Sequence, residues 1–166
     1  MDHSAFQDHI LPMGHICFGC GADNPHGMQI RSTWEEGQDV ATCTWQPKPH
    51  HCGGEDFVNG GVIATVIDCH SFGTAIAWLY RLEGRAMDSA PTTHCVTASM
   101  HVDFLRPTPL AQPVILRATP LRVEGRRVTV ACSVRSGDVE TVRCEGVFVR
   151  VSAAAARDRG RSSATR

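Results

Sequence analysis

The chain has 166 residues, the length of one ordinary domain, and an apolar fraction of 42%, which is enough for a single hydrophobic core. Its formal net charge of −1 argues against nucleic acid as the main partner. The start of the chain is polar and lacks the apolar segment of a signal peptide. We therefore expect a cytoplasmic protein whose eight cysteines are reduced.

The first third of the chain predicts an arm, two strands and a loop. Residues 1–14 are expected to form a flexible N-terminal arm. Residues 28–34 and 40–45 carry strand-forming side chains, and the residues between them predict a turn. Residues 46–58 are rich in proline, histidine and glycine and predict a loop.

One long helix is predicted over residues 60–80. This segment is apolar on nearly every face, which is typical of a helix enclosed by other structure. It is also long enough to raise the question of a membrane span. Acids are rare and costly inside such spans, and the segment contains Asp68. We therefore expect a buried core helix and no membrane as a partner.

Four strands are predicted after a polar loop at residues 81–91. The clearest is residues 94–106, where apolar and polar side chains alternate. The apolar set is Val96, Ala98, Met100, Val102 and Phe104, and the polar set is Cys95, Thr97, Ser99, His101 and Asp103. Residues 113–123, 127–135 and 139–151 predict the other three, separated by glycine-containing turns.

The order of these elements predicts an α+β domain over residues 15–151. Two strands, one buried helix and four further strands fit an antiparallel sheet of about six strands wrapped around one long central helix. Residues 152–166 hold no large apolar side chain and are expected to be a disordered tail.

Three stretches carry a family resemblance through their order and spacing. They are Cys17-Phe18-Gly19-Cys20-Gly21-Ala22-Asp23-Asn24-Pro25-His26-Gly27-Met28, residues 54–68, and Ser99-Met100-His101-Val102-Asp103-Phe104-Leu105-Arg106-Pro107. Together they span residues 17 to about 150, and they resemble the hotdog-fold acyl-CoA thioesterases of the phenylacetate-degradation type. The resemblance implies a hotdog fold, self-association as a dimer or dimer of dimers, and hydrolysis of acyl-CoA thioesters. Coenzyme A enters as part of the substrate, and no separate cofactor is expected.

The resemblance also implies roles for individual residues. Gly60 matches the glycine whose amide holds the thioester carbonyl, and Asp68 matches the acid that acts as nucleophile or general base. Thr97 falls where relatives carry a serine or threonine that helps to position water. Asn59 stands where the family usually has histidine, and its amide can still donate a hydrogen bond.

Elementary chemistry supports an anion site at the start of the helix. The first N–H groups of a helix have no partner within it, and they lie at the positive end of its dipole. Gly60 and Gly61 would let a substrate approach closely, and Asn59 occupies the N-cap position. The alternative interpretation is a tight turn that only begins a helix.

If Gly60 and Asp68 act on the same carbonyl, their spacing requires a second copy of the chain. At ~1.5 Å per residue, eight residues separate them by roughly 12 Å along the helix axis. They cannot address one carbonyl from the same helix, but a twofold axis could bring Gly60 of one copy to Asp68 of another. A purely structural role for a buried Asp68 is the alternative, although an unpaired buried acid is costly.

Three arginines are candidates for the coenzyme A phosphates. Arg106, Arg126 and Arg127 lie at predicted strand ends, where the alternative is a solvated surface charge. His70 is expected to be a core or interface residue, and Thr97 could simply belong to a polar sheet face shared with Ser99 and His101. The acyl group is not indicated, since Phe57, Phe72, Trp78 and Met100 could line a pocket or fill the core.

A metal site is not predicted. Cys17-x-x-Cys20 has the spacing of half a zinc site, with His15 nearby, but no second pair follows and the other cysteines are scattered. Two other functions stay open for this fold: an acyl-CoA hydratase or dehydratase, which would need a His–Asp dyad, and a non-catalytic acyl- or coenzyme A-binding protein.

Overall fold

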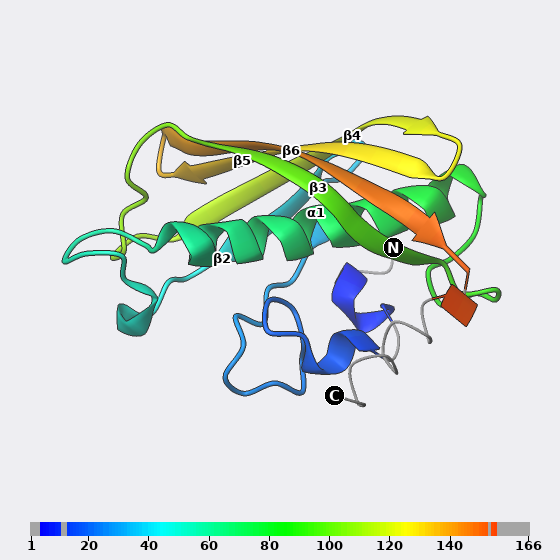
Figure 1. The fold of residues 1–166 in the computed structure, drawn as a ribbon, viewed down its shortest axis with the longest axis horizontal. Coiled ribbons are helices and arrows are strands. Elements are labelled where there is room, and N and C mark those ends of the chain that lie inside the picture. Colours follow the sequence, from blue (N-terminus) through cyan, green and yellow to red (C-terminus); the bar gives the residue numbers. More distant parts are fainter. Residues whose placement is uncertain (1–3, 11–12, 153, 156–166) are drawn as a thin grey trace.

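A computed structural model describes residues 4–10, 13–152 and 154–155. One long helix, α1, lies beneath an antiparallel sheet whose strands arch over it (Figure 1). The elements are η1 (Phe6–Asp8), η2 (Met13–Ile16), β1 (Thr33–Trp34), β2 (Ala41–Trp45), η3 (Pro49–His51), α1 (Gly60–Leu82), β3 (His94–Phe104), β4 (Val114–Glu124), β5 (Arg127–Ser136) and β6 (Val139–Val151). The predicted α+β architecture is confirmed.

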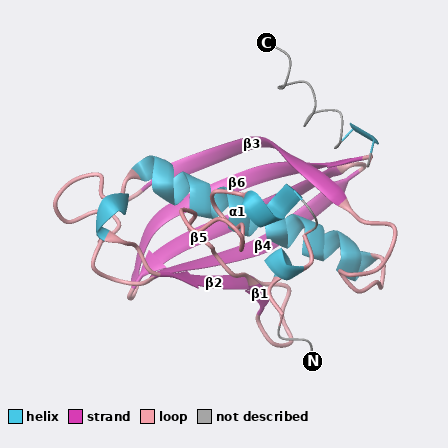
Figure 2. Cartoon of the chain, turned by 90° about the horizontal axis from the view of Figure 1, so that it is seen from below, coloured by secondary structure: helices cyan, strands magenta, loops and turns pink. Residues whose placement is uncertain are grey.

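The sheet has the order β1-β2-β4-β5-β6-β3, so β1 and β3 are its two edges. Figure 2 shows α1 crossing the sheet, with β3 along one edge and β1 at the other. The hairpin turns of β4–β5 and β5–β6 place Gly125 and Gly137 at φ +59° and +55°, values that favour glycine. Because both turns occur where the sequence predicts them, the last three strands begin and end close to their predicted bounds.

Helix α1 is the centre of the core. The Asn59 side chain caps its start, and it ends beyond the predicted Tyr80, at Leu82. By length and composition alone it could cross a membrane, but 67% of its most apolar window is buried inside the protein. The sheet and the N-terminal segment cover the helix, so packing in the hydrophobic core explains why it is apolar on nearly every face.

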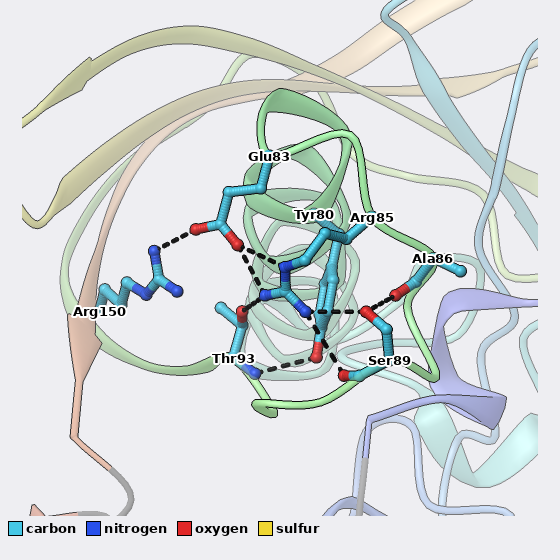
Figure 3. Close-up of polar contacts among 7 residues, drawn as sticks. All are labelled: Tyr80, Glu83, Arg85, Ala86, Ser89, Thr93 and Arg150. Atoms are coloured by element: carbon cyan, nitrogen blue, oxygen red, sulfur yellow. Dashed lines mark hydrogen bonds and ion pairs between the residues drawn. The ribbon is translucent and has the colours of Figure 1, made fainter.

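The C-terminal end of α1 is fastened by a polar cluster (Figure 3). The Tyr80 hydroxyl accepts from the backbone N–H of Thr93 at 2.9 Å, just before β3 begins. Glu83 binds both Arg85 and Arg150, and Arg150 lies near the end of β6. These bonds hold the end of the helix against β3 and β6, which fixes the direction of α1 along the sheet.

Strand β3 departs from the alternation that the sequence predicts. Its pairing with β6 shifts between Thr97 and Ser99, which is the signature of a β-bulge. Thr97 lies opposite Phe148, which is fully buried and contacts Phe72 of α1. The expectation that Thr97 shares a face with Ser99 is therefore wrong, because the extra residue turns Thr97 toward the helix.

The first predicted strand is shorter than expected. Only Thr33–Trp34 pairs with β2, whereas residues 28–34 were predicted. Met28 and Ile30 instead donate their backbone N–H groups to the carbonyls of Phe18 and Gly19. Gln29 between them has φ +50°, which interrupts an extended strand. This part of the chain packs against the cysteine-containing loop.

The described part of the predicted arm is packed, which corrects the expectation of a loose segment for residues 4–10. Phe6 is 3% exposed, and its ring lies 5.1 Å from that of Trp34. Gln7 bonds to both the backbone and the side chain of Ser32, whose hydroxyl contacts His70 Nδ1 at 2.8 Å. Of the predicted disordered tail, residues 153 and 156–166 lie outside the described residues.

Candidate active site

Asp68 and Thr97 meet between the helix and the sheet. The Thr97 hydroxyl donates a hydrogen bond of 2.8 Å to Asp68 Oδ1. Partial burial raises the pKa of Asp68, and the Thr97 bond offsets part of that rise because it stabilises the charged carboxylate. The β-bulge of β3 makes this contact, since it directs Thr97 inward.

The start of α1 leaves one amide of its first turn available. Asn59 Oδ1 accepts from Gly61 N–H at 2.8 Å and from Val62 N–H at 3.3 Å, and the Asn59 carbonyl accepts from Ile63 N–H. Asn59 therefore acts as an acceptor cap toward its own helix, whereas the sequence suggested a donor. No group in the described part of the chain accepts the Gly60 N–H.

A pocket of about 380 Å³ opens beside Gly60. Its walls are mainly apolar and come from the loop before α1, the first turns of α1 and the end of β3, with Phe57, Ile63, Phe104, Leu105 and Pro107 among them. Arg106 also lines it. Phe72 and Trp78 do not line this pocket and instead contact Phe148 and Trp34 in the core.

Arg126 and Arg127 lie far along the sheet from Gly60. They follow β4 at a turn where the Arg126 carbonyl accepts from Arg150 N–H and Arg127 pairs with Val149. This turn lies near the C-terminal end of β6, which pairs with the start of β3. Gly60 instead lies near Phe104, at the other end of β3. Within one chain, only Arg106 of the three predicted arginines is next to the helix start.

His70 lies in the core and not in the pocket. It is fully buried, and burial lowers its pKa to about 4, so it is neutral at pH 7. Its Nδ1 is hydrogen-bonded to the Ser32 hydroxyl, which also accepts from the Gln7 side-chain amide. This histidine ties the N-terminal segment to α1, as a structural residue would.

The only close His–carboxylate pairs among the described residues are on the surface. His101 Nε2 lies 3.3 Å from Asp103, and His15 Nδ1 lies 3.5 Å from Asp23. Asp68 has Thr97 as its partner in place of a histidine. Among the described residues of one chain, no histidine therefore forms a close pair with Asp68.

Three cysteines converge next to Asp68, which the sequence did not predict. Cys69 follows Asp68 on α1, and its sulfur lies 3.6 Å from that of Cys17. Cys20 completes a group whose sulfur atoms all lie within 4.8 Å of one another. Hydrogen bonds from Cys20 and then Cys69 lower the pKa of Cys17. The one sequence signal was the Cys17-x-x-Cys20 spacing with glycines around it.

Comparison with known proteins identifies the family. Residues 55–143, more than half of the chain, match the model of the Thioesterase superfamily, so the chain belongs to that family. A thioesterase superfamily protein from Shewanella loihica PV-4 has a TM-score of 0.61 and 28% identity, over 79% of this chain and 98% of that one. The PaaI protein of E. coli, from the phenylacetic acid degradation operon, has a TM-score of 0.60 over 75% and 81%, respectively. At 13% identity it shows the fold alone. The predicted hotdog fold and family are confirmed.

Named relatives are found among acyl-coenzyme A thioesterases. The protein called acyl-coenzyme A thioesterase THEM4 is 35% identical in Xenopus laevis and 28% identical in Rattus norvegicus, each over 127 residues and 75% of this chain. The matches cover 51% and 49% of those proteins, so the chain spans about half the length of the curated relatives it matches.

Proposed function

We propose that the protein hydrolyses the thioester bond of an acyl-CoA, with the Gly60 N–H as oxyanion donor and Asp68 as the reacting carboxylate. The observation that carries this proposal is the capping pattern of α1. Asn59 accepts the N–H groups of Gly61, Val62 and Ile63, and the Gly60 N–H has no acceptor among the described residues. A free N–H at the positive end of a helix stabilises the charge that develops on an attacked carbonyl oxygen.

The proposed reaction uses Asp68 as general base or as nucleophile. As a base, its carboxylate takes a proton from water while the water oxygen bonds to the thioester carbon. The tetrahedral intermediate then collapses, the carbon–sulfur bond breaks, and the coenzyme A thiolate takes up a proton. As a nucleophile, an Asp68 oxygen bonds to the thioester carbon and the carbon–sulfur bond breaks, which releases the coenzyme A thiolate and leaves a mixed anhydride. Water then hydrolyses the anhydride to the free Asp68 carboxylate and the product acid. Thr97 holds one carboxylate oxygen in either route.

We further propose that the site lies between two copies of the chain. Gly60 is next to Phe104, since a Cβ placed on Gly60 would lie 3.4 Å from that ring, and Asp68 is next to Thr97. Because β3 is an edge strand, its unpaired side can add a strand from a second copy. An antiparallel β3 pair centred near His101 would set the Thr97 end of one strand beside the Phe104 end of the strand from the second copy. That register brings Gly60 of the second copy toward Asp68.

The pocket beside Gly60 suits a small, medium-chain or aryl acyl group. Phe57, Ile63 and Phe104 provide apolar walls, and such walls favour an apolar acyl chain over a charged one. Arg106 at the same pocket is the described arginine best placed for a coenzyme A phosphate. The proposal for Arg126 and Arg127 then depends on the second copy.

A panel of acyl-CoA esters tests the proposed function. Short, medium, long and aryl esters are incubated with the protein, and free thiol is measured with a colorimetric thiol reagent. We expect thiol release with at least one apolar ester, and release slower by about 100-fold or more with the Asp68→Asn protein. Hydration of an enoyl-CoA without thiol release, or tight binding of esters without turnover, would overturn the thioesterase proposal.

A further inference from the structure

A group of three cysteines lies beside the proposed site without a role in the thioesterase chemistry. Cys17 and Cys20 come from the loop before β1, and Cys69 comes from the middle of α1. All three are free thiols. Cys20 and Cys69 are buried, while Cys17 is half-buried between the exposed side chains of Ile16 and Phe18. The group is therefore enclosed on the protein side and accessible from the Cys17 side.

The loop that carries Cys17 and Cys20 is shaped to bring both sulfur atoms to the helix. Gly21 N–H donates to the Cys17 carbonyl at 2.8 Å, which closes the loop between the two cysteines. A Cβ at Gly21 would overlap the Cys17 backbone, and a Cβ at Gly19 would overlap the Cys69 sulfur. Only glycine at these two positions permits the loop to approach α1 so closely.

The spacing of the sulfur atoms fits coordination of a single metal ion. Zn²⁺ binds thiolates at ~2.3 Å, so two sulfur atoms on one tetrahedral ion are about 3.8 Å apart. Cys17 Sγ and Cys69 Sγ are 3.6 Å apart, and Cys20 Sγ is within 4.8 Å of both. A small inward movement of Cys20 would complete the geometry of three ligands on one ion.

We propose that Cys17, Cys20 and Cys69 bind one thiophilic metal ion, with Zn²⁺ as the expected ion. The three thiols lose their protons to solvent as three metal–sulfur bonds form. Among the described residues no fourth histidine, cysteine or carboxylate joins the group, so water or an external ligand occupies the fourth position. The soft thiolate set favours Zn²⁺ over Mg²⁺ or Ca²⁺.

The bound ion would fasten the N-terminal loop to α1 at the residue after Asp68. Cys17 and Cys69 are 52 positions apart in the sequence, so one ion would cross-link two distant segments. Such a link holds the helix turn that carries Asp68, which makes these cysteines positioning residues and not catalytic ones. This inference does not depend on the acyl-CoA proposal, because metal binding has a readout of its own.

Cobalt spectroscopy on the full chain tests the site. The protein is reduced, stripped with a chelator and titrated anaerobically with Co²⁺, then with Zn²⁺. We expect a thiolate-to-cobalt charge-transfer band and visible bands that saturate at one ion per chain and disappear when Zn²⁺ is added. Zn²⁺ should also raise the melting temperature, because it binds the folded state.

Matched variants identify the ligands. Cys17→Ser and Cys20→Ser should each weaken Zn²⁺ affinity by on the order of 100-fold, since one of three ligands is lost. Cys95→Ser is the control, because Cys95 is also buried but lies outside the group, and it should bind as the unaltered chain does. Circular dichroism confirms that each variant is folded. Absent charge-transfer bands, or equal affinity of Cys17→Ser and Cys95→Ser, would overturn the proposal.

Discussion

Thr97 reaches Asp68 across 29 positions of sequence, and its hydroxyl donates to Asp68 Oδ1 at 2.8 Å. The contact exists because β3 is bulged just after Thr97, which turns this side chain from the outer face to the helix face. A single irregularity in an edge strand thus supplies the partner of the only carboxylate within α1.

Replacing Thr97 tests its role as a positioning residue. In Thr97→Val the hydroxyl is lost, and we expect turnover of a good acyl-CoA ester to fall about tenfold. The bond lowers the pKa of Asp68, so its removal raises that pKa further, and the acid limb of the kcat/KM profile should move to higher pH.

Two variants serve as controls for the Thr97 prediction. Thr97→Ser retains a hydroxyl and should restore both the rate and the pH profile. Ser99→Ala removes a hydroxyl beyond the bulge, on the opposite face, and should change neither. An unshifted acid limb in Thr97→Val would show that the hydrogen bond does not govern Asp68.

Proline at Gly60 removes the proposed oxyanion donor with little effect on the helix. Gly60 is the first residue of α1, a position where proline is well tolerated, and Asn59 before it has the extended backbone that precedes proline readily. We expect Gly60→Pro to lose about 100- to 1,000-fold in kcat. Gly60→Ala keeps the N–H and should remain within a few-fold of the original rate. Equal rates for the two variants would exclude the Gly60 amide.

The contribution of the Asn59 cap of α1 to the stability of the protein should be measurable. Asn59 accepts two backbone N–H groups, and removal of such a cap costs about 1 kcal/mol. Urea denaturation of Asn59→Ala should show that loss, while Asn59→Ser should recover much of it. A stability of Asn59→Ala equal to that of the original chain would mean that the helix does not need this cap.

His70 should make the protein less stable in acid. Burial lowers its folded-state pKa to about 4, whereas the unfolded side chain titrates near 6.5. The unfolded state therefore binds the extra proton as pH falls from 6.5 to 4, and stability declines over that window. The contribution is about 3 kcal/mol by the end of it. Denaturation at several pH values, compared with His70→Gln, should show a flatter dependence in the variant. Parallel curves would contradict this account.

The sequence was most informative where a pattern is local. Residues 139–151 were predicted as a strand with the bounds that β6 has, and the Gly125 and Gly137 turns separate strands as expected. Turns of this kind need a positive φ, which glycine adopts easily. Alternation of apolar and polar side chains over ten residues clearly indicates a strand. The buried helix was equally clear, because it is apolar on nearly all sides.

The remaining features depend on contacts between distant residues. The bulge leaves the composition of β3 unchanged, so simple alternation continues through Ala98 and puts Thr97 on the wrong face. Cys69 looked isolated because its partners lie some fifty positions away. Phe6 lies in a mostly polar stretch, and it is buried beside the ring of Trp34 while its neighbour Gln7 bonds to Ser32. Only the folded chain brings these groups together.

The central claim is that Gly60 and Asp68 act on the same carbonyl from two different copies of the chain. Asp68→Asn should keep its fold and lose about 100- to 10,000-fold in turnover, as expected for a missing general base. Gly60→Pro should be similarly inactive. In a dimer of one Asp68→Asn chain and one Gly60→Pro chain, one site combines the unaltered Gly60 with the unaltered Asp68. The other site contains both substitutions.

The most direct test is therefore to co-express the two inactive variants with different affinity tags and purify the mixed dimer. The purified mixed dimer should recover about half of the original activity per dimer, since one of its two sites is intact. Each variant alone stays inactive. Mixed dimers that form but show no more activity than the separate variants would contradict a site shared between copies.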